Sequence, residues 1–189
     1  MRSHANAVVS LLDPASGEKV RGVWSGIEHR LGLRGVQIMP HPHVTYHVAG
    51  AYDRPRLEAS LTRFADSTAP FEMRTAGIGT FGPPWPVVYI DVAKDLGLRT
   101  LHGLVWNMAE AHATGSSELY SPPRWTPHIS LAYGDEAKGE PLTDLEVQQV
   151  KQLLGKGEYR WTLPIDNFAL VLDHGNVQSP VRTFPLRGE

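Results

Sequence analysis

The sequence predicts an α+β fold built as one unit of two related halves. Helix-like and strand-like segments alternate along the chain, and no linker or change of composition divides it. One pattern also returns: proline, histidine, a β-branched residue and a hydroxyl residue occupy positions 42–45 and again 127–130, each time before a turn and a helix. This repeat of about 85 residues indicates a duplicated unit, and a pseudo-twofold axis between the halves would bring both histidines to one groove.

The first half is expected to hold two helices and three strands. Apolar periodicity predicts a helix over residues 18–31 that Gly32 can end, and Asp53 can cap the next helix. Runs of apolar, β-branched and aromatic residues predict strands, and the second of these carries the first histidine. The three predicted strands span residues 7–12, 36–48 and 71–81.

A rigid Gly-Pro-Pro-Trp-Pro string leads into the second half. The longest helical pattern covers residues 96–113, and a loop is expected over 115–123. Thr143, with Glu146 three residues later, is a capping-box signature for a further helix. Strands are predicted at residues 87–92, 129–133 and 161–172, with a last edge strand at 181–186.

Composition excludes several classes of site. The 189 residues include no cysteine, which excludes disulfides, cysteine-ligated zinc, iron–sulfur clusters and thiol nucleophiles. The net charge of −2 argues against a protein that coats long nucleic acid. No segment has the roughly 20 apolar residues that span a bilayer, and the N-terminal apolar run is too short for a signal sequence. We expect a cytoplasmic monomer that binds no membrane and forms one two-lobed domain over residues 1–189.

Histidine two positions before a hydroxyl residue is a weak pattern by itself, and the sequence has three matches. The match at His112 falls at the end of a predicted helix, where positions i and i+2 point in different directions, so we discount it. His43 with Thr45 and His128 with Ser130 fall in predicted strands, where positions i and i+2 share a face. The two strand matches are therefore the candidate site.

Two such strands across a groove would present two imidazoles and two hydroxyls. A neutral histidine can accept the proton of an attacking water or hydroxyl, and a protonated one can donate a proton to the leaving oxygen. The hydroxyls can hydrogen-bond the non-bridging oxygens of a phosphate. This set of groups predicts acid–base catalysis at phosphorus without a metal or other cofactor.

The strings PHVTYHVAG and TPHISLAYG, with FEMRTAGIGTFGPPWPVVYIDV between them, resemble the two-histidine phosphoesterases. The resemblance is to the LigT-like group, which contains 2′-5′ RNA ligases and 2′,3′-cyclic phosphodiesterases, and it covers nearly the whole chain. It implies two antiparallel sheets lining a central groove, with helices outside. It also implies that His43 and His128 are the catalytic acid and base, that Thr45 and Ser130 bind the substrate phosphate, and that Tyr133 stacks over the substrate.

The implied substrate is a nucleotide or RNA end with a 2′,3′-cyclic phosphate, or a 2′-5′ linkage. The sequence departs from the family pattern at two places. Tyr46 and His47 follow the first motif where many members carry leucine and another apolar residue. Tyr133 and Gly134 stand where many ligase-like members carry a basic residue. The second departure favours a small cyclic nucleotide over long RNA.

Two alternatives remain open from the sequence. One is a nucleotide- or RNA-binding module that uses the motifs only as phosphate ligands. The other is a metal site, because His41, His43 and His47 share strand parity if the strand begins early enough. Further residues could contact a substrate, namely Tyr46, Phe81, Trp85 and Trp125 by stacking on a base and Arg124 by meeting a phosphate.

Overall fold

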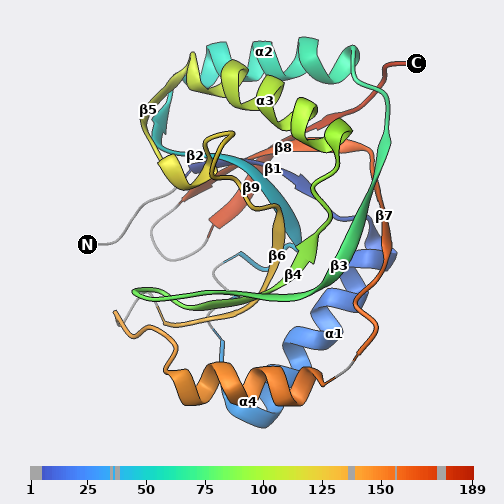
Figure 1. Cartoon of the computed structure of the whole chain (residues 1–189). Coiled ribbons are helices and arrows are strands. Elements are labelled where there is room, and N and C mark those ends of the chain that lie inside the picture. The colour runs from blue at the N-terminus through green and yellow to red at the C-terminus, as the bar shows by residue number, and fades with distance from the viewer. Residues whose placement is uncertain (1–5, 35, 37–38, 136–138, 156, 174–177) are drawn as a thin grey trace.

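The computed structural model describes residues 6–34, 36, 39–135, 139–155, 157–173 and 178–189 (Figure 1). These residues form helices and two antiparallel sheets, which confirms the predicted α+β class. The first sheet has five strands in the order β5 (Ala113–Ser116), β2 (His43–Tyr52), β1 (Asn6–Leu11), β8 (Asn167–Asp173) and β9 (Gln178–Pro185). The second has four in the order β6 (His128–Tyr133), β4 (Val87–Val92), β3 (Phe71–Phe81) and β7 (Thr162–Ile165).

The helices cover the outer faces of the two sheets. Helices α2 (Arg54–Asp66) and α3 (Leu96–Glu110) pack on the first sheet, and α1 (Pro14–Leu31) and α4 (Asp144–Leu154) pack on the second (Figure 1). A short 3₁₀ turn, η2 (Glu118–Tyr120), follows β5. None of the helices in the described part of the chain is both long and apolar enough to cross a bilayer.

The two sheets correspond strand for strand. The order β2-β1-β8-β9 in the first sheet matches β6-β4-β3-β7 in the second, and β5 is an addition at the edge of the first. Two strands exchange sheets: β3, the strand after α2, lies in the second sheet, and β8, the second strand after α4, lies in the first. This arrangement confirms the predicted pseudo-twofold duplication and ties the two halves together.

Local capping signals set several helix boundaries. Helix α1 begins at Pro14, earlier than predicted, because the Asp13 carboxylate accepts hydrogen bonds from the first-turn backbone. Gly32 ends α1 in the left-handed conformation, with φ 71°, as predicted. The predicted caps of α2 and α4, Asp53 and Thr143, are also present, the latter within a complete capping box.

The predicted first motif strand begins too early and ends too soon. Pro40 and Pro42 have no N–H to give to a strand partner, and β2 starts directly after them, at His43. The strand then continues to Tyr52, because β5 pairs with its second half. Residues 37–38 of the prediction lie outside the described residues.

Two further boundaries differ from the sequence prediction. The single strand predicted over residues 161–172 is divided into β7 and β8, which lie in different sheets. The predicted helix over 96–113 ends at Glu110, and β5 follows where the sequence suggested helix and loop. Both differences depend on pairing with strands far away in the sequence, which local propensity does not report.

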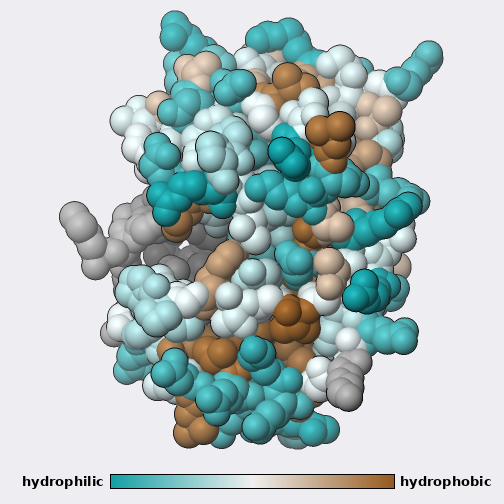
Figure 2. All heavy atoms as spheres, in the orientation of Figure 1, coloured by the Kyte–Doolittle hydropathy of each residue, from teal (hydrophilic) through white to brown (hydrophobic). Residues whose placement is uncertain are grey.

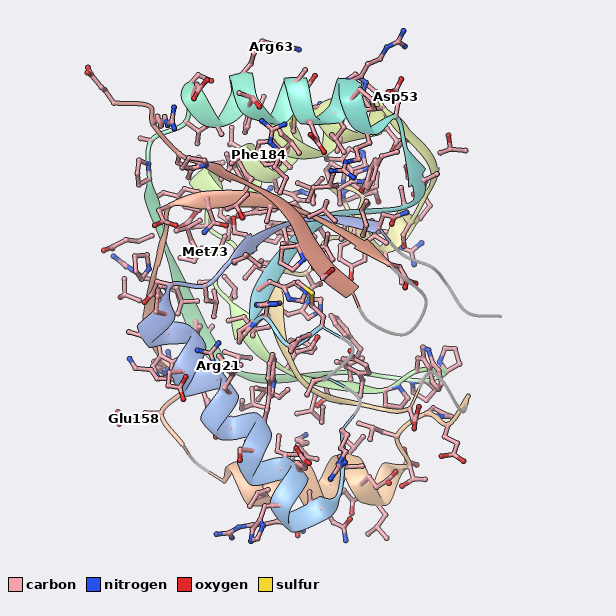
Figure 3. All side chains as sticks on the ribbon, turned by 180° about the vertical axis from the view of Figure 1, so that it is seen from behind. Arg21, Asp53, Arg63, Met73, Glu158 and Phe184 are labelled. Atoms are coloured by element: carbon pink, nitrogen blue, oxygen red, sulfur yellow. The ribbon has the colours of Figure 1, made fainter. Side chains whose placement is uncertain are left out.

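The main core lies between the sheets and their helices. Met73 of β3 and Phe184 of β9 both point into this core, and each is only 2% exposed (Figure 3). Phe184 lies beneath α2, which Asp53 caps at its first turn (Figure 3). Burial of the helix-covered face of each sheet leaves the groove side of the motif strands as the partly exposed face.

Candidate active site

Strand β2 carries a β-bulge directly after its motif. Thr45 is opposite Val9 and His47 is opposite Val8, so Tyr46 is the extra residue. Tyr46 and His47 are therefore both fully buried, although strict alternation would turn one of them outward. The bulge reverses the alternation for the rest of the strand.

Strand β6 carries the same bulge at the same place. Ser130 is opposite Tyr89 and Ala132 is opposite Val88, so Leu131 is the extra residue. In both motifs the extra residue is the third after the histidine, and the burial patterns of the two segments match. Tyr133 would face away from His128 by simple alternation, and the bulge is what brings it to the same side.

The bulges and open edges leave backbone carbonyls without a strand partner. Indole N–H groups donate to these carbonyls instead. The indole of Trp125 donates to the Thr45 carbonyl at 2.8 Å, and the indole of Trp24 donates to the Ser130 carbonyl at 2.9 Å. His102 stacks on Trp125 with ring centroids 3.8 Å apart. These rings hold the motif strands in place, a role that no local sequence pattern indicated.

Both motif strands line one cavity of about 760 Å³. His43, Thr45, His128, Ser130 and Tyr133 all lie in its wall, so the structure brings these five predicted residues together. In the space-filling view the surface is hollowed on the left, between the two halves (Figure 2). Other lining residues include Trp24, Phe81, Trp85, Leu119, Tyr120 and Arg124.

The charge of the lining suits an anion. Among the described lining residues, Arg124 is the only lysine or arginine, and none is Asp or Glu. Phe81 and Trp85 remain available to contact a base. Tyr46 and Trp125 do not, because they are 0% and 1% exposed and stack on each other inside the core. Of the two roles that the sequence left open for these residues, stacking on a substrate or packing in the core, the structure shows packing in the core.

Each histidine is anchored in the same way. The Nδ1 atom of His43 lies 2.7 Å from the carbonyl oxygen of His41, and that of His128 lies 2.8 Å from the carbonyl oxygen of Thr126. A carbonyl oxygen only accepts, so Nδ1 carries the hydrogen in both rings. The neutral ring then has its lone pair on Nε2, and the charged ring has a proton to donate there. Each ring can therefore serve as a base or as an acid through Nε2.

The motif hydroxyls have free hydrogen-bonding capacity. Within the described part of the chain, neither the Thr45 nor the Ser130 side chain is bonded to another residue. Both lie two positions after a cavity histidine and line the same cavity. They are thus available to donate to the oxygens of a bound anion.

Burial shifts both histidines toward the neutral form, but their surroundings differ. Burial lowers the pKa of His43 to about 4, and repulsion from a positive charge on His128 contributes in the same direction. Burial also lowers the pKa of His128, while the Thr126 carbonyl and the Asp91 carboxylate oppose that shift. A carboxylate therefore favours the proton on His128.

Two aromatic rings pack against the imidazole of His128. Tyr89 packs on it with ring centroids 5.2 Å apart, and Phe81 meets it edge-on at 4.9 Å. The Tyr89 ring lies across β3 at Gly79, where a Cβ atom would come within 2.3 Å of a ring carbon. Gly79 is therefore needed for this packing, a role that the sequence analysis missed.

The alternative of a metal site on three neighbouring histidines is wrong. The bulge turns His47 into the core, where its Nδ1 lies 2.7 Å from the Tyr52 hydroxyl and its Nε2 3.0 Å from Glu110. His41 precedes the strand and is exposed. Across the described residues, no three His, Cys, Asp or Glu side chains are grouped to hold a metal ion.

The discounted third match lies away from the cavity. His112 follows the end of α3, and its Nε2 lies 3.0 Å from the Ser60 hydroxyl on α2. It does not line the cavity. His112 therefore offers a natural control for the two motif histidines.

A family model described as the 2′-5′ RNA ligase superfamily matches residues 18–176. The chain belongs to this superfamily. The two-histidine (2H) phosphoesterase family that its motifs resemble is thereby confirmed, and membership supports an activity of the phosphoesterase type. No curated protein sequence matches the chain.

Solved structures show the same 2H fold. TT0787 of Thermus thermophilus superposes with a TM-score of 0.66 at 22% identity, covering 98% of this chain and 99% of that one. Escherichia coli LigT complexed with NADP⁺ gives 0.59 at 15% identity, covering 98% and 99%. Kluyveromyces marxianus Usb1 with uridine monophosphate gives 0.51 at 8% identity, covering 95% and 99%. At these identities the likeness establishes the fold.

Proposed function

We propose that this chain is a metal-independent phosphoesterase that hydrolyses 2′,3′-cyclic phosphates of nucleotides or RNA ends. The observation that carries the proposal is the matched pair of histidines. Each is anchored through Nδ1, each keeps Nε2 for proton transfer, and both line one cavity without acidic residues among those described. The exchange of β3 and β8 between the sheets supports one two-lobed catalytic domain.

The proposed reaction needs one proton acceptor and one proton donor. One histidine takes a proton from water as the water oxygen bonds to phosphorus, and the other gives a proton to the ribose oxygen as its bond to phosphorus breaks. Thr45 and Ser130 bind the non-bridging oxygens, whose charge increases in the transition state. The same groups would cleave 2′-5′ linkages, or form them when concentrations favour ligation.

The size and charge of the cavity favour a small substrate. A volume of about 760 Å³ suits a small molecule, and its wall is largely aromatic and apolar. Arg124 alone among the described lining residues adds a permanent positive charge, whereas a long RNA strand is usually held by many phosphate contacts. The neighbours in complexes with NADP⁺, ATP, 3′-AMP and uridine monophosphate support a nucleotide ligand.

Turnover of 2′,3′-cyclic AMP in buffer containing EDTA tests the proposal. We expect the wild type to hydrolyse it to a nucleoside monophosphate, and His43→Ala and His128→Ala each to lose at least about 10²-fold in kcat. The double variant should lose little more than either single one, because the two groups act in one step. His112→Ala, which removes the histidine of the discounted match, should keep wild-type activity.

The same assay separates the alternatives. Activity that EDTA abolishes and a divalent metal restores would refute the proposed mechanism. A wild type that binds the nucleotide, with neither cyclic phosphates nor 2′-5′ dinucleotides turned over, would support the binding module instead. Loss of turnover with retained binding in His128→Ala is the result expected of an enzyme.

A further inference from the structure

The two motif histidines face different residues across their strand pairs. His43 on β2 is directly opposite Leu11 on β1, whereas His128 on β6 is directly opposite Asp91 on β4. Opposite residues of an antiparallel pair place their side chains on the same face of the sheet. Leu11 therefore accompanies His43, and a carboxylate accompanies His128.

The remaining neighbours of His43 are apolar. Val9, Met39, Ala169 and Val171 form a buried cluster on this part of the first sheet, and Leu11 packs against it. The charged or titratable groups that act on His43 within the described residues are His41 and, across the cavity, His128. Nothing near His43 in the described part of the chain stabilises a positive charge except the carbonyl of His41.

His128 has a different set of neighbours. Tyr89 on β4 and Phe81 on β3 pack on its ring, and His43 faces it across the cavity. On the other side of Asp91, Gly77 of β3 is its partner in the sheet and has no side chain to pair with the carboxylate. Of these neighbours, Asp91 is the one that carries a carboxylate.

We propose that Asp91 makes His128 the proton donor of the reaction and leaves His43 as the proton acceptor. This assignment rests on the proposed function. The Nε2 of neutral His43 takes the water proton as the new bond to phosphorus forms, and the Nε2–H of charged His128 protonates the ribose oxygen as that bond breaks. His43 ends charged and His128 neutral, and exchange with solvent restores both.

Asp91 acts here as a positioning residue for charge and does not touch the substrate. A carboxylate nearby stabilises an imidazolium and not a neutral imidazole. Burial lowers the pKa of both histidines, but Asp91 opposes that shift at His128, whereas a charged His128 adds to it at His43. The required combination is neutral His43 with charged His128, and a carboxylate beside His128 alone favours it over the reverse.

The pH dependence of kcat/KM for Asp91→Asn tests the assignment. The alkaline limb reports loss of the proton from the acid, so it should move to lower pH by about one unit when the carboxylate is removed. The acid limb, which reports protonation of His43, should stay in place. Glu72→Gln removes an exposed carboxylate from β3 of the same sheet and should leave both limbs unchanged.

Titration of the histidine rings by NMR gives a readout that does not need turnover. In the wild type His128 should gain its proton at a higher pH than His43, and Asp91→Asn should lower the His128 value by about one unit. In a second variant, Leu11→Asp, the His43 value should rise, because the carboxylate is now placed in the other half.

Two results would overturn the inference. One is a shift of the acid limb with the alkaline limb unchanged, which would make His128 the base. The other is a His128 titration that Asp91→Asn leaves where it was. Absence of any phosphoesterase activity would instead refute the proposed function, and the ring titrations would still decide whether Asp91 sets the order of protonation.

Discussion

The two halves have the same strand pairing, but the side chains next to the two motif strands differ. In both, a motif strand with a bulge at its fourth position pairs with a short strand, β1 or β4, and that short strand pairs on its other side with an exchanged strand, β8 or β3. Under the first motif, Val9 lies between Thr45 and Ala169 in the sheet. At the equivalent place under the second motif, Tyr89 lies between Ser130 and Gly79.

This difference separates placement from chemistry. Backbone pairing, bulges and carbonyl-bound Nδ1 atoms are the same in both halves, and they place the two imidazoles equivalently. The side chains of β1 and β4 are not the same. The neighbours of His43 are apolar, whereas His128 packs on an aromatic ring and is opposite a carboxylate. Two strands with the same backbone pairing thus give their histidines different surroundings.

Among variants that alter the residues in which the two halves differ, Gly79→Ala should have the largest effect on stability and activity. Its Cβ would lie 2.3 Å from a carbon of the Tyr89 ring, and that ring is packed against Phe81 and His128. We expect a loss of about 3 kcal/mol in the free energy of unfolding, at the upper end for an overpacked site, and a lower kcat. Urea denaturation and the cyclic phosphate assay measure both.

The equivalent position in the first half suggests a second substitution that should restore the stability of this variant. Its equivalent pair is Val9 with Ala169, so Gly79→Ala combined with Tyr89→Val copies a packing that the fold already uses. The double variant should recover most of the lost stability. Gly22→Ala, at an exposed position of helix α1 with no atom near its Cβ, should raise stability slightly and serves as the control for an added methyl. A double variant less stable than Gly79→Ala would contradict the equivalence of the two halves.

A smaller effect distinguishes the two tryptophans that bond the motif carbonyls. Trp125→Phe removes the donor to Thr45 at a position that is 1% exposed, and we expect a loss of about 2 kcal/mol. Trp24→Phe removes the donor to Ser130 where the indole is partly exposed, so water can replace it and the loss should be about 1 kcal/mol. Equal losses in urea denaturation would show that burial does not distinguish the two sites.

The smallest expected effect is a pH dependence that belongs to the first sheet and its helices. Burial is the main reason that the pKa of His102 falls from 6.5 to about 4 in the folded protein, against the hydrogen bond to the Tyr46 carbonyl. Between these two pKa values His102 is protonated in the unfolded chain but not in the folded one. Stability is therefore lost as pH falls from about 6.5 toward about 4. Between about pH 7 and pH 5.5 this amounts to about 1 kcal/mol for one such group.

His102→Gln should remove that part of the pH dependence. The amide can still donate to the Tyr46 carbonyl but does not titrate, so the variant should lose less stability than the wild type over this range. Trp24→Phe, which alters the equivalent support of the motif strand in the second sheet, should keep the wild-type pH dependence. An unchanged slope in His102→Gln, by urea denaturation at both pH values, would contradict the prediction.

Residue patterns alone were enough to predict the elements that have strong local causes. Asp53 and Thr143 cap their helices, Gly32 ends α1, and the repeated proline–histidine strings mark two equivalent strands. Period-two alternation placed His43 with Thr45 and His128 with Ser130 on common faces. These predictions succeeded because each depends on residues within a few positions of one another.

Contacts between distant parts of the chain set the remaining features. The bulges turn His47 into the core and Tyr133 toward the cavity, and no local sequence pattern predicted either bulge. The division between β7 and β8, the addition of β5 and the burial of Trp125 likewise follow from which strands and rings meet. The pairing of His128 with Asp91, and of His43 with Leu11, is of the same kind. Short-range rules fix which residues can perform the chemistry, and long-range strand register decides the surroundings in which each must do so.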